Sequence, residues 1–181
     1  ALAQQFAYSH PERCKKLILA ATSAGAVMVP GRPSVLLKMA SPRRYIQPSH
    51  GVNIAPDIYG GAFRRDPHLA EKHAAKVRSS GKLGYYWQLF AGLGWTSVHW
   101  LHKIRQPTLI LAGDDDPIIP LVNMKLLAWR IPNSELHVID DGHLFPVTRA
   151  QSVAPLITGF LAEERQPAVI RHTAALKAPR A

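Results

Sequence analysis

Two short polar segments carry the residue types needed for general acid–base chemistry. The first is Gly113-Asp114-Asp115-Asp116-Pro117, and the second is Asp140-Asp141-Gly142-His143. An aspartate that holds an imidazole in one tautomer lets that histidine take a proton from a nucleophile and return it to a leaving group. Taken singly, an aspartate run or a Gly-His pair is more often only a turn. Their occurrence together predicts an Asp–His pair in which the aspartate orients the imidazole.

Each polar segment directly follows a predicted strand. These strands are residues 107–112 and 136–139, and His137 in the second one indicates a place near an edge of the sheet. A third strand, residues 17–21, is a short apolar run, as expected of a central strand in a parallel sheet. Functional side chains of such sheets gather on the loops at the carboxyl ends of the strands. We therefore expect the two polar segments to meet at one edge of a sheet.

Three helical patterns alternate with these strands, at residues 2–7, 121–130 and 153–161. Pro11 ends the first pattern, and Pro155 is compatible with the last one only near its first turn. The order helix, strand, insertion, strand, helix, strand, helix predicts an α/β fold. The apolar stripes of the first and last patterns are Leu2, Ala3, Phe6 and Ala7, and Val153, Leu156, Ile157, Phe160 and Leu161.

The inserted segment, residues 25–105, interrupts this alternation. Prolines and the pair Gly60-Gly61 break it into short pieces. Its second half is rich in aromatic side chains, which fit either a pocket wall for alkyl chains or a small core of the segment itself. These residues are Tyr85, Tyr86, Trp87, Phe90, Trp95 and Trp100.

The chain has 181 residues, and its 22 Lys and Arg against 12 Asp and Glu give a net charge of +10. The excess is local: residues 32–105 carry 12 basic against 3 acidic residues, whereas residues 106–164 carry 3 against 8. Basic residues without a nucleic-acid-binding motif usually form a solvated face. We therefore expect no nucleic-acid partner.

Composition excludes several other classes of protein. The single cysteine, Cys14, cannot form an internal disulfide framework, so a reducing compartment and a structural thiol are expected. No apolar run is long enough to span a bilayer, and none follows a basic start as in a signal peptide. The remaining histidines do not have metal-ligand spacing, so neither a metal nor another cofactor is expected. They are His10, His50, His68, His73, His99, His102, His137 and His172.

Residues 107–120 and 141–143 resemble the carboxyl half of the α/β-hydrolase fold. That family has a strand followed by Gly-x-x-Asp-x-x-x-Pro, and its Gly-to-Asp spacing selects Asp116 over Asp115. Its triad runs along the chain as nucleophile, acid and then histidine. The resemblance implies that Asp116 and His143 are catalytic. It also implies a serine nucleophile upstream of Ala1, so that the chain is a carboxyl-terminal fragment without activity of its own.

Several segments are similar, more narrowly, to the intracellular depolymerases of medium-chain-length polyhydroxyalkanoates from pseudomonads. This resemblance implies a serine esterase that hydrolyses the polymer to 3-hydroxyalkanoic acids or oligomers. It further implies a cytoplasmic protein associated with polyhydroxyalkanoate granules, with the polymer and the granule surface as partners. The similar segments are residues 11–17, 41–48, 57–67, 82–95 and 100–107.

The resemblance also divides the chain. Residues 1–24 and 106–164 are expected to form the hydrolase core, with residues 25–105 as a mostly helical lid and residues 165–181 as a mobile basic tail. Ser23 is an internal competitor for the nucleophile, because small residues flank it as in a nucleophile elbow. The residues after Ser23 do not predict the helix that an elbow must enter. Two other functions stay open: another α/β hydrolase, such as an epoxide hydrolase, dehalogenase or small-ester hydrolase, and a basic non-catalytic binding module.

Overall fold

A computed structural model of the chain describes residues 1–76 and 82–163. Its sheet has three parallel strands, β1 (Leu17–Ala20), β2 (Thr108–Gly113) and β3 (Ser134–Ile139), in the order β1-β2-β3. The predicted α/β class is confirmed. The residues that the sequence assigns to a mobile basic tail, 165–181, lie outside the described part of the chain.

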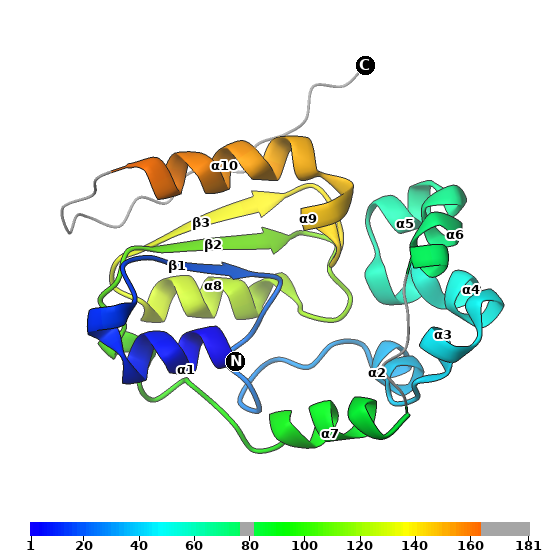
Figure 1. Cartoon of the computed structure of the whole chain (residues 1–181), viewed down its shortest axis with the longest axis horizontal. Coiled ribbons are helices and arrows are strands. Elements are labelled where there is room, and N and C mark those ends of the chain that lie inside the picture. Colours follow the sequence, from blue (N-terminus) through cyan, green and yellow to red (C-terminus); the bar gives the residue numbers. More distant parts are fainter. Residues whose placement is uncertain (77–81, 164–181) are drawn as a thin grey trace.

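Helices cover both faces of the sheet. They are α1 (Leu2–Ser9), α8 (Leu121–Arg130) and α10 (Ala150–Ala162). Successive strand residues point to opposite faces, so Leu19 and Ile110 pack with α1 and α8, whereas Leu109 and Leu111 pack with α10. Figure 1 shows α10 on one side of the sheet and α1 with α8 on the other. This three-layer packing explains why β1 and β2 are rich in apolar residues, whereas β3 contains Ser134, Glu135 and His137 and is only partly buried.

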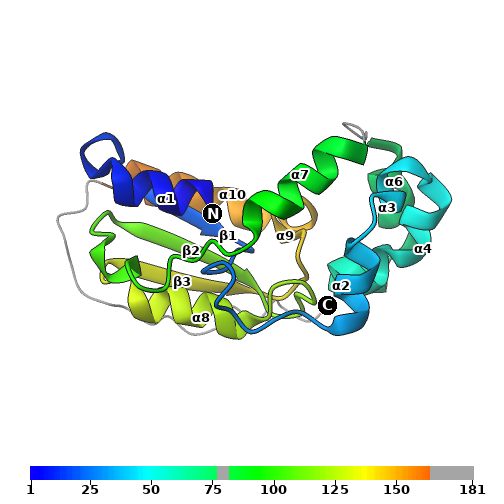
Figure 2. The same ribbon diagram turned by 90° about the horizontal axis from the view of Figure 1, so that it is seen from below.

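The inserted segment joins β1 to β2 and is mostly helical. Its helices α2–α6 gather beyond the carboxyl ends of the strands, and α7 returns along the molecule towards α1 (Figures 1 and 2). The helices of this segment are α2 (Pro33–Met39), α3 (Arg43–Ile46), α4 (Pro48–Tyr59), α5 (Ala62–Arg65), α6 (Pro67–Lys76) and α7 (Lys82–Gly92). Three further short elements are the 3₁₀ turns η1 (Pro11–Arg13) and η2 (Leu101–Lys103), and α9 (Phe145–Thr148), which precedes α10.

The buried face of α1 differs from the predicted stripe. Leu2 is 83% exposed and Phe6 is 39% exposed, whereas Gln4 is fully buried beside Ala7. The amide of Gln4 donates to the carbonyl of Ser23, and its oxygen accepts the hydroxyl of Ser97. Hydrogen bonding thus compensates for burying a polar side chain on this face. The helix is therefore rotated about its axis relative to the predicted apolar stripe, and a hydrophobic pattern cannot predict that rotation.

The last helix also differs from its prediction in two respects. Pro155 is the sixth residue of α10, beyond the first turn, because the helix begins at Ala150. Proline removes one main-chain donor, to the carbonyl of Gln151, and both residues lie on the exposed side, where water can bind that carbonyl. Leu161 is 54% exposed, so the buried stripe reduces to Val153 and Phe160 with flanking, partly buried side chains.

Candidate active site

Asp116 lies in the loop after β2, with only 2% of its side chain exposed. Its Oδ1 accepts hydrogen bonds from the main-chain N–H groups of Ile118 and Ile119, each at 2.9 Å. This turn fixes the carboxylate and leaves its other oxygen directed elsewhere. A buried aspartate that is already satisfied on one oxygen is well placed to orient a partner through the other.

His143 follows β3, which pairs with β2, so the two loops leave the same edge of the sheet. Its Nδ1 lies 2.8 Å from Oδ2 of Asp116, and its main-chain N–H donates to the carbonyl of Tyr59 at 2.7 Å. The carboxylate acts as acceptor, so the proton is assigned to Nδ1 and the Nε2 lone pair remains available. The imidazole is 23% exposed. The structure therefore brings the two predicted site residues together as an Asp–His pair.

The other two aspartates of the run have different partners. Asp115 pairs with Arg64 of α5 at 2.5 Å, and it also accepts the main-chain N–H of Gly61. Asp114 accepts the main-chain N–H of Asp141. Burial raises the pKa of Asp114 above its usual value, and the negative charge of Asp140 raises it further. Only Asp116 of the three bonds to His143.

Asp141, which the sequence places only in the segment that resembles the family's histidine loop, is a buried carboxylate next to the Asp–His pair. Its side chain is 2% exposed. One oxygen accepts the main-chain N–H groups of Ala62 and Gly142, at 2.5 and 2.7 Å, and the other accepts the hydroxyl of Thr148 at 2.6 Å. Arg149 also contacts this carboxylate, with its Nε 3.3 Å from Oδ2. The only sequence signal was its place two residues before the histidine, which says nothing about burial.

The sequence predicts only a break at the turn between α4 and α5, but this turn contacts both polar loops. Gly60 and Gly61 have φ values of +66° and +48°, a region that other residues rarely adopt. A Cβ on Gly61 would lie 2.0 Å from Oδ1 of Asp141 and equally close to the nitrogen of Gly142. The pair of glycines is therefore required by both conformation and space.

Ser23 is not placed as a nucleophile. It follows β1 without entering a helix, and its Oγ accepts the main-chain N–H of Gly25 at 3.2 Å. Within residues 1–76 and 82–163, no serine hydroxyl forms a hydrogen bond with His143. The same described residues contain no group of three or more metal-ligating side chains that could hold an ion. They also contain no helix with the length and hydropathy to cross a bilayer.

The six aromatic residues of the inserted segment separate into two groups. Tyr85 is buried and donates its hydroxyl to the carbonyl of Met39. Trp100 stacks on Tyr8 with ring centroids 4.5 Å apart, and Trp95 donates to the side chain of Gln5. The exposed group belongs to α7 and consists of Tyr86, Trp87 and Phe90. Half of the set therefore packs within the protein.

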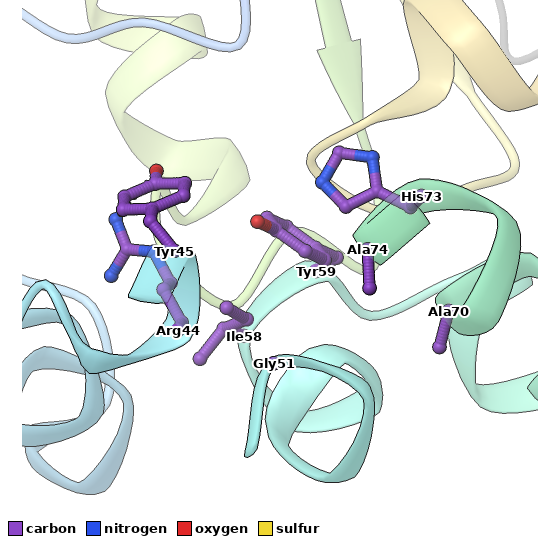
Figure 3. Close-up of a pocket in the computed structure, with 8 residues that line it drawn as sticks. All are labelled: Arg44, Tyr45, Gly51, Ile58, Tyr59, Ala70, His73 and Ala74. Atoms are coloured by element: carbon purple, nitrogen blue, oxygen red, sulfur yellow. Dashed lines mark hydrogen bonds between the residues drawn. The ribbon is translucent and has the colours of Figure 1, made fainter. Parts of the chain in front are cut away.

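A small cavity lies within the inserted segment, between α3, α4 and α6 (Figure 3). Its volume is about 10 Å³, about the size of a single water molecule. Burial raises the pKa of Tyr59 to about 12 and lowers that of His73 below its usual value. The cavity is too small for a substrate. Its lining residues are Arg44, Tyr45, Gly51, Ile58, Tyr59, Ala70, His73 and Ala74.

Known proteins are similar to this chain in sequence or in fold. The poly(3-hydroxyalkanoate) depolymerase of Ectopseudomonas oleovorans is 76% identical over 170 residues, which cover 94% of this chain and 60% of the depolymerase. A thermophilic esterase from Thermogutta terrifontis is 28% identical, with a TM-score of 0.68 over 88% of this chain and 60% of the esterase. The enol-lactonase from Burkholderia xenovorans shares the fold, with 19% identity and a TM-score of 0.71 over 89% of this chain and 61% of the lactonase.

The chain therefore spans about 60% of the length of the relatives it matches. A family model described as the alpha/beta hydrolase fold matches residues 1–150, most of the chain and both polar loops. The parallel sheet, with an Asp–His pair on the loops after its second and third strands, agrees with that match. The chain belongs to the alpha/beta hydrolase fold family.

Proposed function

We propose that this chain supplies the acid and the base of a serine ester hydrolase that degrades medium-chain-length poly(3-hydroxyalkanoate). The proposal rests above all on the 2.8 Å hydrogen bond between the buried Asp116 and His143. The second support is the 76% identity to a poly(3-hydroxyalkanoate) depolymerase, which extends over nearly the whole chain.

In the proposed reaction, Nε2 of His143 takes the proton of a serine hydroxyl as the serine oxygen attacks the ester carbonyl. The tetrahedral intermediate expels the alkoxide of the neighbouring monomer, which receives that proton from His143. Water, activated by the same nitrogen, then hydrolyses the acyl-enzyme and releases the 3-hydroxyacyl product. Asp116 holds the proton on Nδ1 and stabilises the imidazolium formed in each step.

The inserted segment is proposed to act as a lid. Its helices α2–α6 lie beyond the carboxyl ends of the strands, on the side where Asp116 and His143 are placed (Figure 1). We further propose that the protein works in the cytoplasm at polyhydroxyalkanoate granules. Exposed apolar side chains on α7, including Trp87 and Phe90, suit contact with a polyester. Part of the basic charge of the inserted segment is neutralised within the protein, because Arg64 pairs with Asp115 and Arg65 pairs with Asp140.

The test uses the intact protein, expressed from its complete reading frame. Hydrolysis of emulsified medium-chain polyester and of a p-nitrophenyl alkanoate is measured for wild type, His143→Ala and a control, His137→Ala, whose imidazole contacts Glu135 on β3. Loss of the general base is expected to lower kcat by about 10²–10⁴-fold. The control is expected to stay within a fewfold of wild type. Wild-type rates in His143→Ala would refute the proposal.

A covalent probe separates the proposed serine mechanism from hydrolases that use an aspartate nucleophile. A fluorophosphonate is expected to label one serine of the intact protein, and peptide mapping identifies it. We expect Ser23→Ala to leave both the labelling and the esterase rate unchanged, because Ser23 is bound within its own loop. Hydrolysis without any labelled serine would favour an epoxide hydrolase or dehalogenase type of mechanism instead.

A further inference from the structure

We propose that Asp141, together with the α4–α5 turn of the inserted segment, positions His143 for proton transfer. We call residues 59–62 and Asp141 the latch. The inference rests on the proposed function, because it gives these residues a role in a reaction performed by His143. None of the latch residues is proposed to touch the substrate.

The latch holds the histidine loop through its main chain. The N–H of His143 donates to the carbonyl of Tyr59 at 2.7 Å, and this bond joins the end of α4 to the backbone of the base itself. Displacement of Tyr59 would remove the acceptor of that N–H. The position of the imidazole relative to Asp116 therefore depends on a turn that lies more than eighty residues earlier in the sequence.

Asp141 makes the second connection. Its Oδ1 accepts N–H groups from Ala62 of the turn and from Gly142, the residue next to His143. One buried oxygen atom thus bonds to the inserted segment and to the histidine loop at once. Its Oδ2 is held by Thr148 and Arg149, so the carboxylate itself has little freedom to rotate. Hydrogen bonds to a buried charged group are among the stronger ones.

Gly60 and Gly142 allow the α4–α5 turn to approach the aspartate loop and the histidine loop closely. A Cβ on Gly142 would lie 1.9 Å from the carbonyl oxygen of Tyr59, and one on Gly60 would lie 2.1 Å from the carbonyl oxygen of Asp115. The turn is therefore in direct backbone contact with both the aspartate loop and the histidine loop. Gly61 adds a donor to the Asp115 carboxylate, at 2.7 Å. Movement of the turn would disturb the two loops that carry the Asp–His pair.

Small displacements of a catalytic group have large effects on rate, because proton transfer requires near-ideal geometry. A misplacement of about 1 Å can cost about 10²-fold. Removing Asp141 leaves the donors of Ala62 and Gly142 without their shared acceptor, and the histidine loop is then fixed less precisely. The proposed role of the latch is confined to the geometry of proton transfer and includes no contact with the substrate. The expected signature is a loss in kcat with KM almost unchanged.

The test compares Asp141→Ala with Asp141→Asn in the intact protein. Asparagine keeps the oxygen that accepts from Ala62 and Gly142, but its NH₂ group replaces the oxygen that accepts from Thr148 and Arg149. It should therefore restore the activity in part. The control is Asp57→Ala, which removes an exposed carboxylate paired with Lys38 in the same inserted segment. We expect kcat on a p-nitrophenyl ester to fall about 10²-fold in Asp141→Ala, with KM within twofold. The asparagine variant should lose about 3–10-fold, as Thr148→Val does, and the control should stay within about twofold of wild type.

A spectroscopic readout separates positioning from a purely structural role. The Nδ1–H of His143, hydrogen-bonded to Asp116, gives a downfield proton NMR resonance, which His143→Ala identifies by its loss. In folded Asp141→Ala this resonance should broaden or shift upfield, and in Asp141→Asn it should lie closer to its wild-type position. Wild-type kcat, or an unchanged resonance, in folded Asp141→Ala would overturn the inference, even if its melting temperature were lower.

Thr148→Val provides a test that does not depend on the folding of Asp141→Ala. It removes the hydroxyl that donates to Oδ2 of Asp141 and that also lies 3.1 Å from the carbonyl oxygen of Leu144, and it leaves Arg149 in place. We expect a fall in kcat of about 3–10-fold, with the resonance shifted. If Asp141→Ala does not fold, an unchanged kcat and resonance in Thr148→Val overturn the inference. Failure of the proposed function is distinguishable, because full activity in His143→Ala would refute it whatever the latch variants do.

Discussion

The Oδ2 atom of Asp116 lies 2.8 Å from Nδ1 of His143, while Oδ1 of the same carboxylate accepts two main-chain N–H groups. Because the two oxygens have different partners, the orientation of the carboxylate is fixed. The same hydrogen bonds also fix which atom any substituted side chain presents to the imidazole.

Asp116→Asn is expected to abolish most activity without unfolding the protein. The amide oxygen would keep the bonds to Ile118 and Ile119, so the NH₂ group would face His143. Nδ1 must then act as an acceptor, which puts the proton on Nε2 and removes the base. We expect kcat in the intact protein to fall about 10³–10⁴-fold with KM little changed. Steady-state kinetics on a soluble ester measure this, and a loss below tenfold would contradict it.

Gly61→Ala is expected to destabilise the chain strongly. Its φ of +48° and the 2.0 Å approach to Asp141 leave no room for a methyl group. Backbone strain alone costs about 1–3 kcal/mol, and each kcal/mol lowers the melting temperature of a chain of this size by about 2–4 °C.

The matched control for Gly61→Ala is Gly159→Ala. Gly159 lies inside α10, and nothing is within 4 Å of a Cβ placed there. Alanine in a helix interior is more favourable than glycine by about 0.5–1 kcal/mol, so this variant should melt slightly higher than wild type. Thermal melts followed by circular dichroism compare the two. Equal changes in melting temperature in the two variants would contradict the destabilisation expected from the close contact at Gly61.

The sequence was sufficient to predict the class of fold, because a central strand of a parallel sheet is buried on both faces and therefore reads as an apolar run. β2 shows this most clearly, since all of its residues are buried. The meeting of Asp116 and His143 was also expected, because the register of β2 and β3 brings their following loops to one edge. Their catalytic role stays a proposal.

Long-range polar contacts could not be predicted in the same way. Asp141 is buried by groups from α5, α9 and its own loop, and nothing in the residues around it specifies those partners. Gln4 is a similar case, because its burial depends on Ser23 and Ser97, which lie far along the chain. Hydrophobic periodicity describes where apolar surface goes. Hydrophobic periodicity does not predict which polar side chains are buried when their hydrogen-bond partners lie in distant segments.

Gln4→Ala is expected to be more damaging than Leu2→Ala, the reverse of what the apolar pattern of α1 suggests. Gln4 is fully buried, and its removal leaves the hydroxyl of Ser97 and the carbonyl of Ser23 without this partner. Leaving buried polar groups unpaired and opening a cavity should cost about 2–4 kcal/mol. Leu2 is 83% exposed, so its truncation should change stability by less than about 0.5 kcal/mol. Urea unfolding of both variants measures the difference, and equal losses would contradict it.

His73 is expected to make the stability of the chain fall as the pH decreases below about 6.5. Burial lowers its pKa in the folded state, where the ring packs edge-on against Tyr59 and Phe63. The unfolded chain therefore binds a proton first as the pH falls, and its stability decreases between the unfolded pKa and the lower folded one. His73→Phe keeps an aromatic ring but cannot titrate. Urea unfolding at pH 7.5 and 5.5 should show a larger loss of unfolding free energy for wild type than for His73→Phe. Equal losses in the two proteins would mean that another group is responsible, because every other titrating residue is common to both.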